Sequence, residues 1–228
     1  MQGNYFDAHL IGEKTAHDLC GGIVYGGVRP ADLQKIFLFA GELRSVIGAG
    51  DERFPRDAEV VDLNLADDRL LEHLKQPPAH WWPLCGAART DGRPVILHIG
   101  APEYETLAKG ISKLARAFPA ARFLIDPFLC GKDSNWKAGV CLADAPNVWS
   151  TTRGLFGGAN LWEKRADREA FHFVVGEVGA GKLLFASGGL ESKMNPVEWL
   201  ESIAFLDATQ RGLILRENAI EALALQLE

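Results

Sequence analysis

The sequence has no long stretches of a single chemical character, and each such absence excludes a class of protein. No tract is rich in lysine and arginine, and the 228 residues carry a formal net charge of −6, so no nucleic-acid partner is expected. No apolar run reaches the roughly 18 residues that a membrane-spanning helix needs, so no membrane association is expected. The first residues lack the basic and then apolar segments of a secretory signal, so we expect a soluble, cytoplasmic protein.

Cysteine chemistry is not expected to hold the chain together. The four cysteines show no CxxC spacing, and in a cytoplasmic chain such residues are typically reduced and mostly buried. Internal repeats, low-complexity segments and linker-like stretches are absent as well. With 47% hydrophobic and 24% charged residues, the composition is that of an ordinary globular protein. We therefore expect residues 1–228 to form one domain.

Short apolar segments alternate with amphipathic segments along most of the chain. This alternation predicts parallel strands joined by helices, in a sheet that is buried on both faces. Strands are expected at residues 4–9, 22–26, 58–65, 93–100, 121–127, 147–152 and 182–187. Helices are expected at residues 103–119, 166–179, 196–206 and 215–228. The order of these elements indicates the α/β class.

Residues 36–40, with the sequence IFLFA, fit either a strand or part of an amphipathic helix that begins after Pro30. If they form a strand, the strands number eight and would close a barrel; otherwise there are seven, and the barrel would be imperfect or open. We therefore predict a TIM-type (β/α) barrel. It would be short, because such barrels typically have about 250 residues, and its strand count leaves room for distortion.

Polar residues stand at the ends of several predicted strands. In parallel α/β folds the chemistry lies at the carboxyl ends of the strands, because loops and side chains converge there. His9, His98 and Asp126 stand at three such ends, and neutral imidazole and carboxylate are both ligands of zinc. Arg153 and Ser187 stand at two further ends, where they could bind a substrate. The sequence thus predicts a site for one divalent metal and a small molecule at this rim.

Each of these residues also has a structural interpretation. A histidine at a strand end is often a hydrogen-bonded core or loop residue, and Asp126 precedes Pro127 in a pair that commonly starts a turn. Arg153 equally suits a loop cap or a salt bridge with a carboxylate. Glu59 and Asp62 lie near the end of another predicted strand and fit the rim less clearly.

Several segments match, in order, the motifs of one known superfamily. Residues 94–100 read Pro-Val-Ile-Leu-His-Ile-Gly, which matches Pro-Val-x-x-His-x-Gly in full, and residues 7–11 match Asp-x-His-x-His at the first His. Phe118-Pro119, Asn147-Val148 and Asn218-Ala219 match later motifs. On these motifs the sequence resembles the amidohydrolase superfamily, in particular its compact metal-dependent hydrolase branch related to aminocarboxymuconate-semialdehyde decarboxylase. The match runs from about residue 58 onward and includes the start of the chain.

The resemblance implies a TIM barrel that holds a divalent metal and acts as a hydrolase or decarboxylase on a small molecule. Three positions depart from the superfamily's metal site. Ile11 replaces the second His of the first motif, Asp126 stands where a His is expected, and Gly188 replaces the Asp that serves as metal ligand and general base. His9, His98 and Asp126 therefore remain as the expected zinc ligands, and the catalytic base is unassigned.

Two functions follow from this pattern. The first is a metal-dependent hydrolase or decarboxylase. The second is a catalytically inactive barrel that holds no metal and binds a small ligand or serves as an assembly subunit. A small-molecule ligand is expected in either case, and self-association into a homo-oligomer is left open.

Two further motifs are weaker. Residues 176–183, GEVGAGKL, look like a phosphate-binding loop, but Leu183 stands where magnesium binding needs Ser or Thr. Ser187 lacks the first glycine of a serine-hydrolase elbow, which leaves a serine hydrolase as a weak third option.

Overall fold

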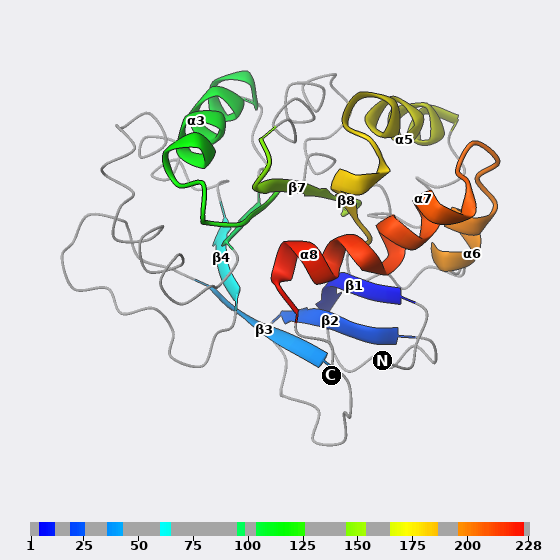
Figure 1. Ribbon diagram of the computed structural model, residues 1–228, viewed down its shortest axis with the longest axis horizontal. Helices are drawn as coiled ribbons and strands as arrows, with labels where there is room; N and C mark the ends of the chain where they lie inside the picture. Colours follow the sequence, from blue (N-terminus) through cyan, green and yellow to red (C-terminus); the bar gives the residue numbers. More distant parts are fainter. Residues whose placement is uncertain are drawn as a thin grey trace.

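The computed structural model describes residues 5–11, 19–25, 36–42, 60–64, 95–98, 104–125, 145–153, 165–186 and 196–225. In this part of the chain, eight strands form one sheet in the order of the sequence, and every adjacent pair is parallel (Figure 1). The strands are β1 (Tyr5–Ile11), β2 (Leu19–Tyr25), β3 (Ile36–Glu42), β4 (Val60–Asn64), β5 (Val95–His98), β6 (Phe123–Ile125), β7 (Val148–Thr151) and β8 (Leu183–Leu184).

Helices occupy the connections and the C-terminal part of the described chain. They are α3 (Tyr104–Ala117), α5 (Arg165–Val178), α6 (Pro196–Glu201), α7 (Ala208–Gly212) and α8 (Asn218–Leu223). A short 3-10 segment, η4 (Ala180–Lys182), precedes β8, and a π-helical segment, η5 (Leu213–Glu217), joins α7 to α8. Of the helices described, none is long and apolar enough to cross a membrane.

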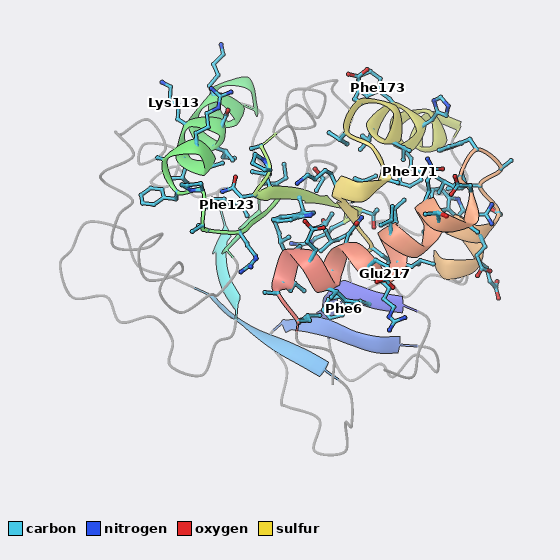
Figure 2. The ribbon with its side chains drawn as sticks, in the orientation of Figure 1. Phe6, Lys113, Phe123, Phe171, Phe173 and Glu217 are labelled. Carbon is cyan, nitrogen blue, oxygen red and sulfur yellow. The ribbon has the colours of Figure 1, made fainter. Side chains whose placement is uncertain are left out.

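Residues 36–40 are part of strand β3, which pairs with β2 and β4. The ambiguity of the IFLFA segment is therefore resolved in favour of the eight-strand alternative. The periodicity of helix α3 is confirmed as well, because Ile111, Leu114 and Ala115 are buried at helical spacing. Lys113 lies on the opposite side and points away from the sheet (Figure 2).

The chain from Leu183 to Ala186 is buried on both faces, as a parallel strand between two layers requires. Leu183 and Phe185 belong to a cluster with α5 and the helices that follow β8, including Phe171 and Trp199. Leu184 and Ala186 belong to the second cluster. The remaining members of that cluster are Phe6, Leu124, Trp149, Ala219, Ala222 and Leu223.

The second cluster shows that the sheet curls into a barrel. It joins Phe6 of β1 to Leu124 of β6, which are five strands apart in the sheet order. Neighbouring strands are about 4.8 Å apart, so in a flat sheet these residues would be separated by roughly 24 Å. Their packing requires β1 to lie across from β6, β7 and β8. In Figure 1, β1–β3 and β7–β8 accordingly lie on opposite sides of α8, whose residues belong to the same cluster. The prediction of a TIM-type barrel is confirmed.

The C-terminal part of the described chain packs at the seam between β8 and β1. Among the described residues, no ladder joins these two strands. The outer edge of the β8 segment is bonded instead to the C-terminal helices: the N–H of Phe185 donates to Ile214 O at 2.9 Å, and Asn218 Nδ2 donates to Leu183 O at 2.7 Å. Because η5 also contacts β1, the π-helical segment bridges the seam.

Two buried asparagines fasten the amino-terminal ends of the last strands. Asn147, just before β7, directs its Nδ2 to the carbonyl oxygens of Ala115, Phe118 and Ala121, at 2.9–3.1 Å, and so holds the end of α3. Asn218, at the start of α8, donates to Ala180 O and Leu183 O, both at 2.7 Å. The Asn-Val and Asn-Ala motifs of the sequence therefore have structural roles.

Candidate functional site at the carboxyl ends of the strands

The rim of the barrel receives the carboxyl ends of all described strands, because every ladder is parallel. His98 is the last residue of β5 and pairs with Asn64, the last residue of β4. On the other side of β5, Leu97 pairs with Ile125, the residue before Asp126. Asp126 itself lies outside the described residues. The backbone thus brings the chain positions of His98 and Asp126 to the ends of neighbouring strands.

His9 belongs to β1, two residues before the strand ends at Ile11. The pairing of β1 with β2 changes register between Asp7 and Leu10: three residues along β1 correspond to two residues along β2. Such a register shift is a β-bulge or a related irregularity, and bulges are common next to active sites because they re-aim the residues they contain. The first superfamily motif therefore carries a local irregularity at Ala8 and His9.

The end of β7 carries three polar residues whose backbone is fixed by side-chain hydrogen bonds. The N–H of Arg153 donates to Thr151 Oγ1 at 3.2 Å. The Thr152 N–H donates to Leu184 O at 2.9 Å, as in a parallel ladder. Two residues after Leu184, the Ala186 N–H donates to Thr152 Oγ1 at 2.8 Å, and that hydroxyl donates to Ala186 O at 3.2 Å. The half-buried Arg153 thus emerges at the rim from a rigid strand end.

Ser187 and Gly188 directly follow Ala186 but lie outside the described residues. Arg153 lies two residues after the end of β7. The pairing of Arg153 with Ser187 at a substrate site stays a prediction.

Sequence reasoning missed two polar residues at strand ends. Glu42 ends β3, where it pairs with Asp62 of β4, and Asn64 ends β4. Glu42 was missed because the IFLFA segment before it fits a helix as well as a strand. Asn64 could have been found, since it stands near the end of a clearly apolar segment. Glu59 lies outside the described residues.

Lys182 lies at the opposite end of β8 from the rim, in the turn that resembles a phosphate-binding loop. Helix α5 ends at Val178, Gly179 takes a positive φ of 78°, and η4 leads into the strand. The Lys182 ammonium lies 4.4 Å from the Trp149 ring centroid and donates to Pro146 O at 2.7 Å. Burial lowers the pKa of Lys182, and the nearby Glu221 carboxylate partly opposes this shift. These contacts make Lys182 a structural cation, and the segment is a helix-to-strand turn.

The predicted metal ligands have the chemistry that a divalent cation needs, since two imidazoles and one carboxylate form a known ligand set for zinc. Within the described part of the chain, the structure forms no cluster of three or more His, Cys, Asp or Glu residues suited to a metal. The predicted set includes Asp126, which falls outside that part, so the ligand set remains a prediction.

Comparisons with known proteins bear on the fold. No protein-family model matches the sequence, and a search of curated proteins also finds no match. Among solved structures, an amidohydrolase 2 from Bifidobacterium longum subsp. infantis is similar at 17% identity and a TM-score of 0.67, covering 99% of this chain and 100% of that one. The chain therefore shares the fold of this amidohydrolase 2.

Two further solved structures are similar over nearly their whole length. A candidate 2-pyrone-4,6-dicarboxylic acid hydrolase from Pseudomonas putida has 17% identity and a TM-score of 0.64, with 100% of both chains covered. A 2,6-dihydroxybenzoate decarboxylase from Rhizobium has 12% identity and a TM-score of 0.56, covering 98% of this chain and 99% of that one. At these identities the likeness concerns the fold, and the resemblance found in the sequence is confirmed at that level.

Proposed function

We propose that the chain is a metal-dependent hydrolase or decarboxylase that acts on a small carboxylate. In this proposal His9, His98 and Asp126 hold one divalent metal, with zinc as the first choice. Arg153 and Ser187 bind the substrate. The proposal is supported by the described strands of one parallel sheet, in which His98 ends β5, His9 lies near the end of β1 and Arg153 follows β7.

The metal is supported by the kind of residues present and by where their strands end. His98 ends β5, and Asp126 follows the residue that pairs with Leu97 one strand further along. A bound divalent metal would polarise a substrate oxygen and lower the pKa of a bound water. Because Gly188 has no side chain, the position of the superfamily's general base offers no proton acceptor. The proposal therefore assigns metal and substrate ligands but no general base.

The substrate class is supported by Arg153 and by the similar structures. A guanidinium binds carboxylate groups with two parallel hydrogen bonds, so an arginine at the rim suits an anionic substrate. The names of two similar proteins refer to carboxylated ring compounds, a pyrone dicarboxylic acid and a dihydroxybenzoate. A small carboxylate, in particular one on a planar ring, is therefore the substrate class to test first.

The metal content of the purified chain tests the proposal. Protein purified without chelator should contain about one equivalent of zinc, and His98→Ala should lose most of it, because removing one of three ligands leaves too few for a tight site. His172→Ala is the matched control, since His172 is exposed on helix α5. Metal that is absent from the wild-type chain, or retained in full by His98→Ala, would contradict the proposed ligand set.

Substrate turnover provides the second test. The wild-type chain is incubated with 2-pyrone-4,6-dicarboxylate and with 2,6-dihydroxybenzoate, and product formation is followed by chromatography. Turnover of either compound that depends on the metal and falls in His98→Ala supports an enzyme. Tight binding of these compounds without turnover would instead identify an inactive, ligand-binding barrel.

A further inference from the structure

Two successive backbone N–H groups at the carboxyl end of β7 are bonded in different ways. The Thr152 N–H donates to Leu184 O at 2.9 Å and so continues the ladder with β8. The Arg153 N–H donates instead to a side-chain oxygen, Thr151 Oγ1, at 3.2 Å. A hydroxyl that accepts from the N–H two residues later forms a local turn, which competes with the sheet ladder for the backbone. The Thr151 hydroxyl therefore fixes the point at which Arg153 leaves the sheet.

The Thr151 side chain is buried on the inner face of the barrel. Thr151 is only 3% exposed, and it pairs with Leu184 of β8. Residues that pair in register lie on the same face of a sheet. Leu184 belongs to the cluster that joins Phe6 of β1 to Leu124 of β6 across the barrel. The hydroxyl therefore lies on the inner side of the sheet, at the base of the half-buried Arg153.

We propose that Thr151 is a positioning residue, whose hydroxyl holds the backbone of Arg153 in the orientation that lets the guanidinium bind a carboxylate ligand. This inference rests on the proposed function, because it takes Arg153 as the residue that binds the substrate carboxylate. Thr151 acts through Arg153 and does not touch the ligand. Displacing a group that orients a ligand by about 1 Å can cost roughly a hundredfold, so one buried hydrogen bond at the base of Arg153 is enough to control recognition.

Ligand affinity in Thr151 variants tests the proposal. The probe is isophthalate, a planar benzene dicarboxylate, and its Kd is measured by calorimetry for the full chain. Thr151→Val keeps the branched shape of the side chain but removes the acceptor, and should raise the Kd by about tenfold or more, because the turn that carries Arg153 is no longer fixed. Thr151→Ser keeps the hydroxyl and should bind within about threefold of wild type. Thr209→Val, at an exposed threonine of α7, is the matched control.

Amide hydrogen exchange, followed by NMR, measures the hydrogen bond itself. In Thr151→Val the Arg153 amide should exchange at least about tenfold faster than in wild type, because it has lost its acceptor. The Thr152 amide should keep its wild-type rate, since its bond to Leu184 O does not involve the changed side chain. Faster exchange of both amides would mean that the variant loosens the whole strand end, and would overturn the positioning role.

A double-mutant cycle separates action through Arg153 from a general effect on the site. In an Arg153→Ala background, Thr151→Val should change the Kd by less than about twofold, because the effects of coupled residues are not additive. An equally large effect in both backgrounds would contradict the proposal. If Thr151→Val does not fold, Thr151→Ala replaces it, and the same comparison with Thr151→Ser decides.

The two possible failures give different results. If the wild-type chain binds isophthalate and Thr151→Val binds it equally well, the positioning role is wrong and the proposed function stands. If the wild-type chain binds no carboxylate probe, the proposed substrate class is wrong, and the positioning role fails with it.

Discussion

Replacing Asn218 with alanine should lower the free energy of unfolding by about 3 kcal/mol, because the change leaves buried carbonyl groups without their donor. Asn218 is only 2% exposed, and it donates to Ala180 O and Leu183 O at 2.7 Å. Ala180 O also accepts from the Leu183 N–H, so the loss at that oxygen is about 1 kcal/mol, a typical net hydrogen bond. Leu183 O lies on a fully buried residue, so its desolvation should cost about 2–3 kcal/mol. The higher helix propensity of alanine returns roughly 0.5 kcal/mol.

Urea denaturation of the wild type and Asn218→Ala, followed by circular dichroism, measures this difference. For a chain of this length a loss of about 3 kcal/mol corresponds to a Tm lower by roughly 6–12 °C. Glu217→Ala is the matched control, because the Glu217 side chain is 54% exposed and its Oε1 lies 3.7 Å from Arg216 Nη1, which is a long distance for an ion pair (Figure 2). That variant should change stability by less than about 0.5 kcal/mol. If Asn218→Ala unfolds within about 0.5 kcal/mol of wild type at an unchanged m-value, the assigned role of the asparagine is wrong.

Two further predictions concern the same end of the barrel. In urea denaturation at pH 8, Asn147→Asp should lower the free energy of unfolding by about 1 kcal/mol or more beyond Asn147→Ala. The reason is that a carboxylate would face three carbonyl oxygens that now accept hydrogen bonds from Asn147 Nδ2. Equal stability of the two variants would refute this role. Burial lowers the pKa of Lys182 in the folded state, so a charged Lys182 reduces the free energy of unfolding. This destabilisation is lost as the pH rises through the folded-state pKa toward the unfolded-state value of about 10.4. The stability of wild type relative to Lys182→Met should therefore increase as the pH is raised from neutral toward the ordinary lysine pKa, with Lys113→Met as the exposed-lysine control, and a flat or falling difference would contradict the shift.

Local patterns predicted most of the described strands and helices. Apolar segments such as 93–100 and 147–152 contain β5 and β7, and the periodic segment 103–119 contains α3. The IFLFA segment could not be assigned, because a short apolar run fits a strand and a helix equally and only its pairing with β2 and β4 decides. For the same reason, the sequence alone does not identify Glu42 as a residue at the carboxyl end of a strand.

The roles of the two asparagines could not be predicted from local sequence. The acceptors of Asn147 lie 26–32 residues earlier in the chain, and those of Asn218 lie 35–38 residues earlier. The resemblance marked both positions as superfamily motifs without showing what they do. The hydrogen bonds show that Asn147 binds the carbonyl groups at the end of α3 and that Asn218 binds the carbonyl groups beside β8. Both roles depend on tertiary contacts. The seam at β8 escaped prediction for the same reason, because it is made by a π-helical segment whose sequence reads as an ordinary helix.

These contacts explain why the fold is easier to recognise than the chemistry. Asn147, Asn218 and Lys182 hold the amino-terminal ends of β7 and β8, whereas the proposed ligands stand at the carboxyl ends. In such barrels, residues at the amino-terminal ends of the strands serve stability, and residues at the carboxyl ends serve catalysis. On the resemblance found in the sequence, Ile11 and Gly188 stand where the superfamily has metal ligands, and neither residue takes part in the contacts of Asn147, Asn218 and Lys182. Substitutions at the rim should consequently change metal content and ligand binding while leaving the unfolding free energy nearly constant, whereas Asn218→Ala should do the reverse.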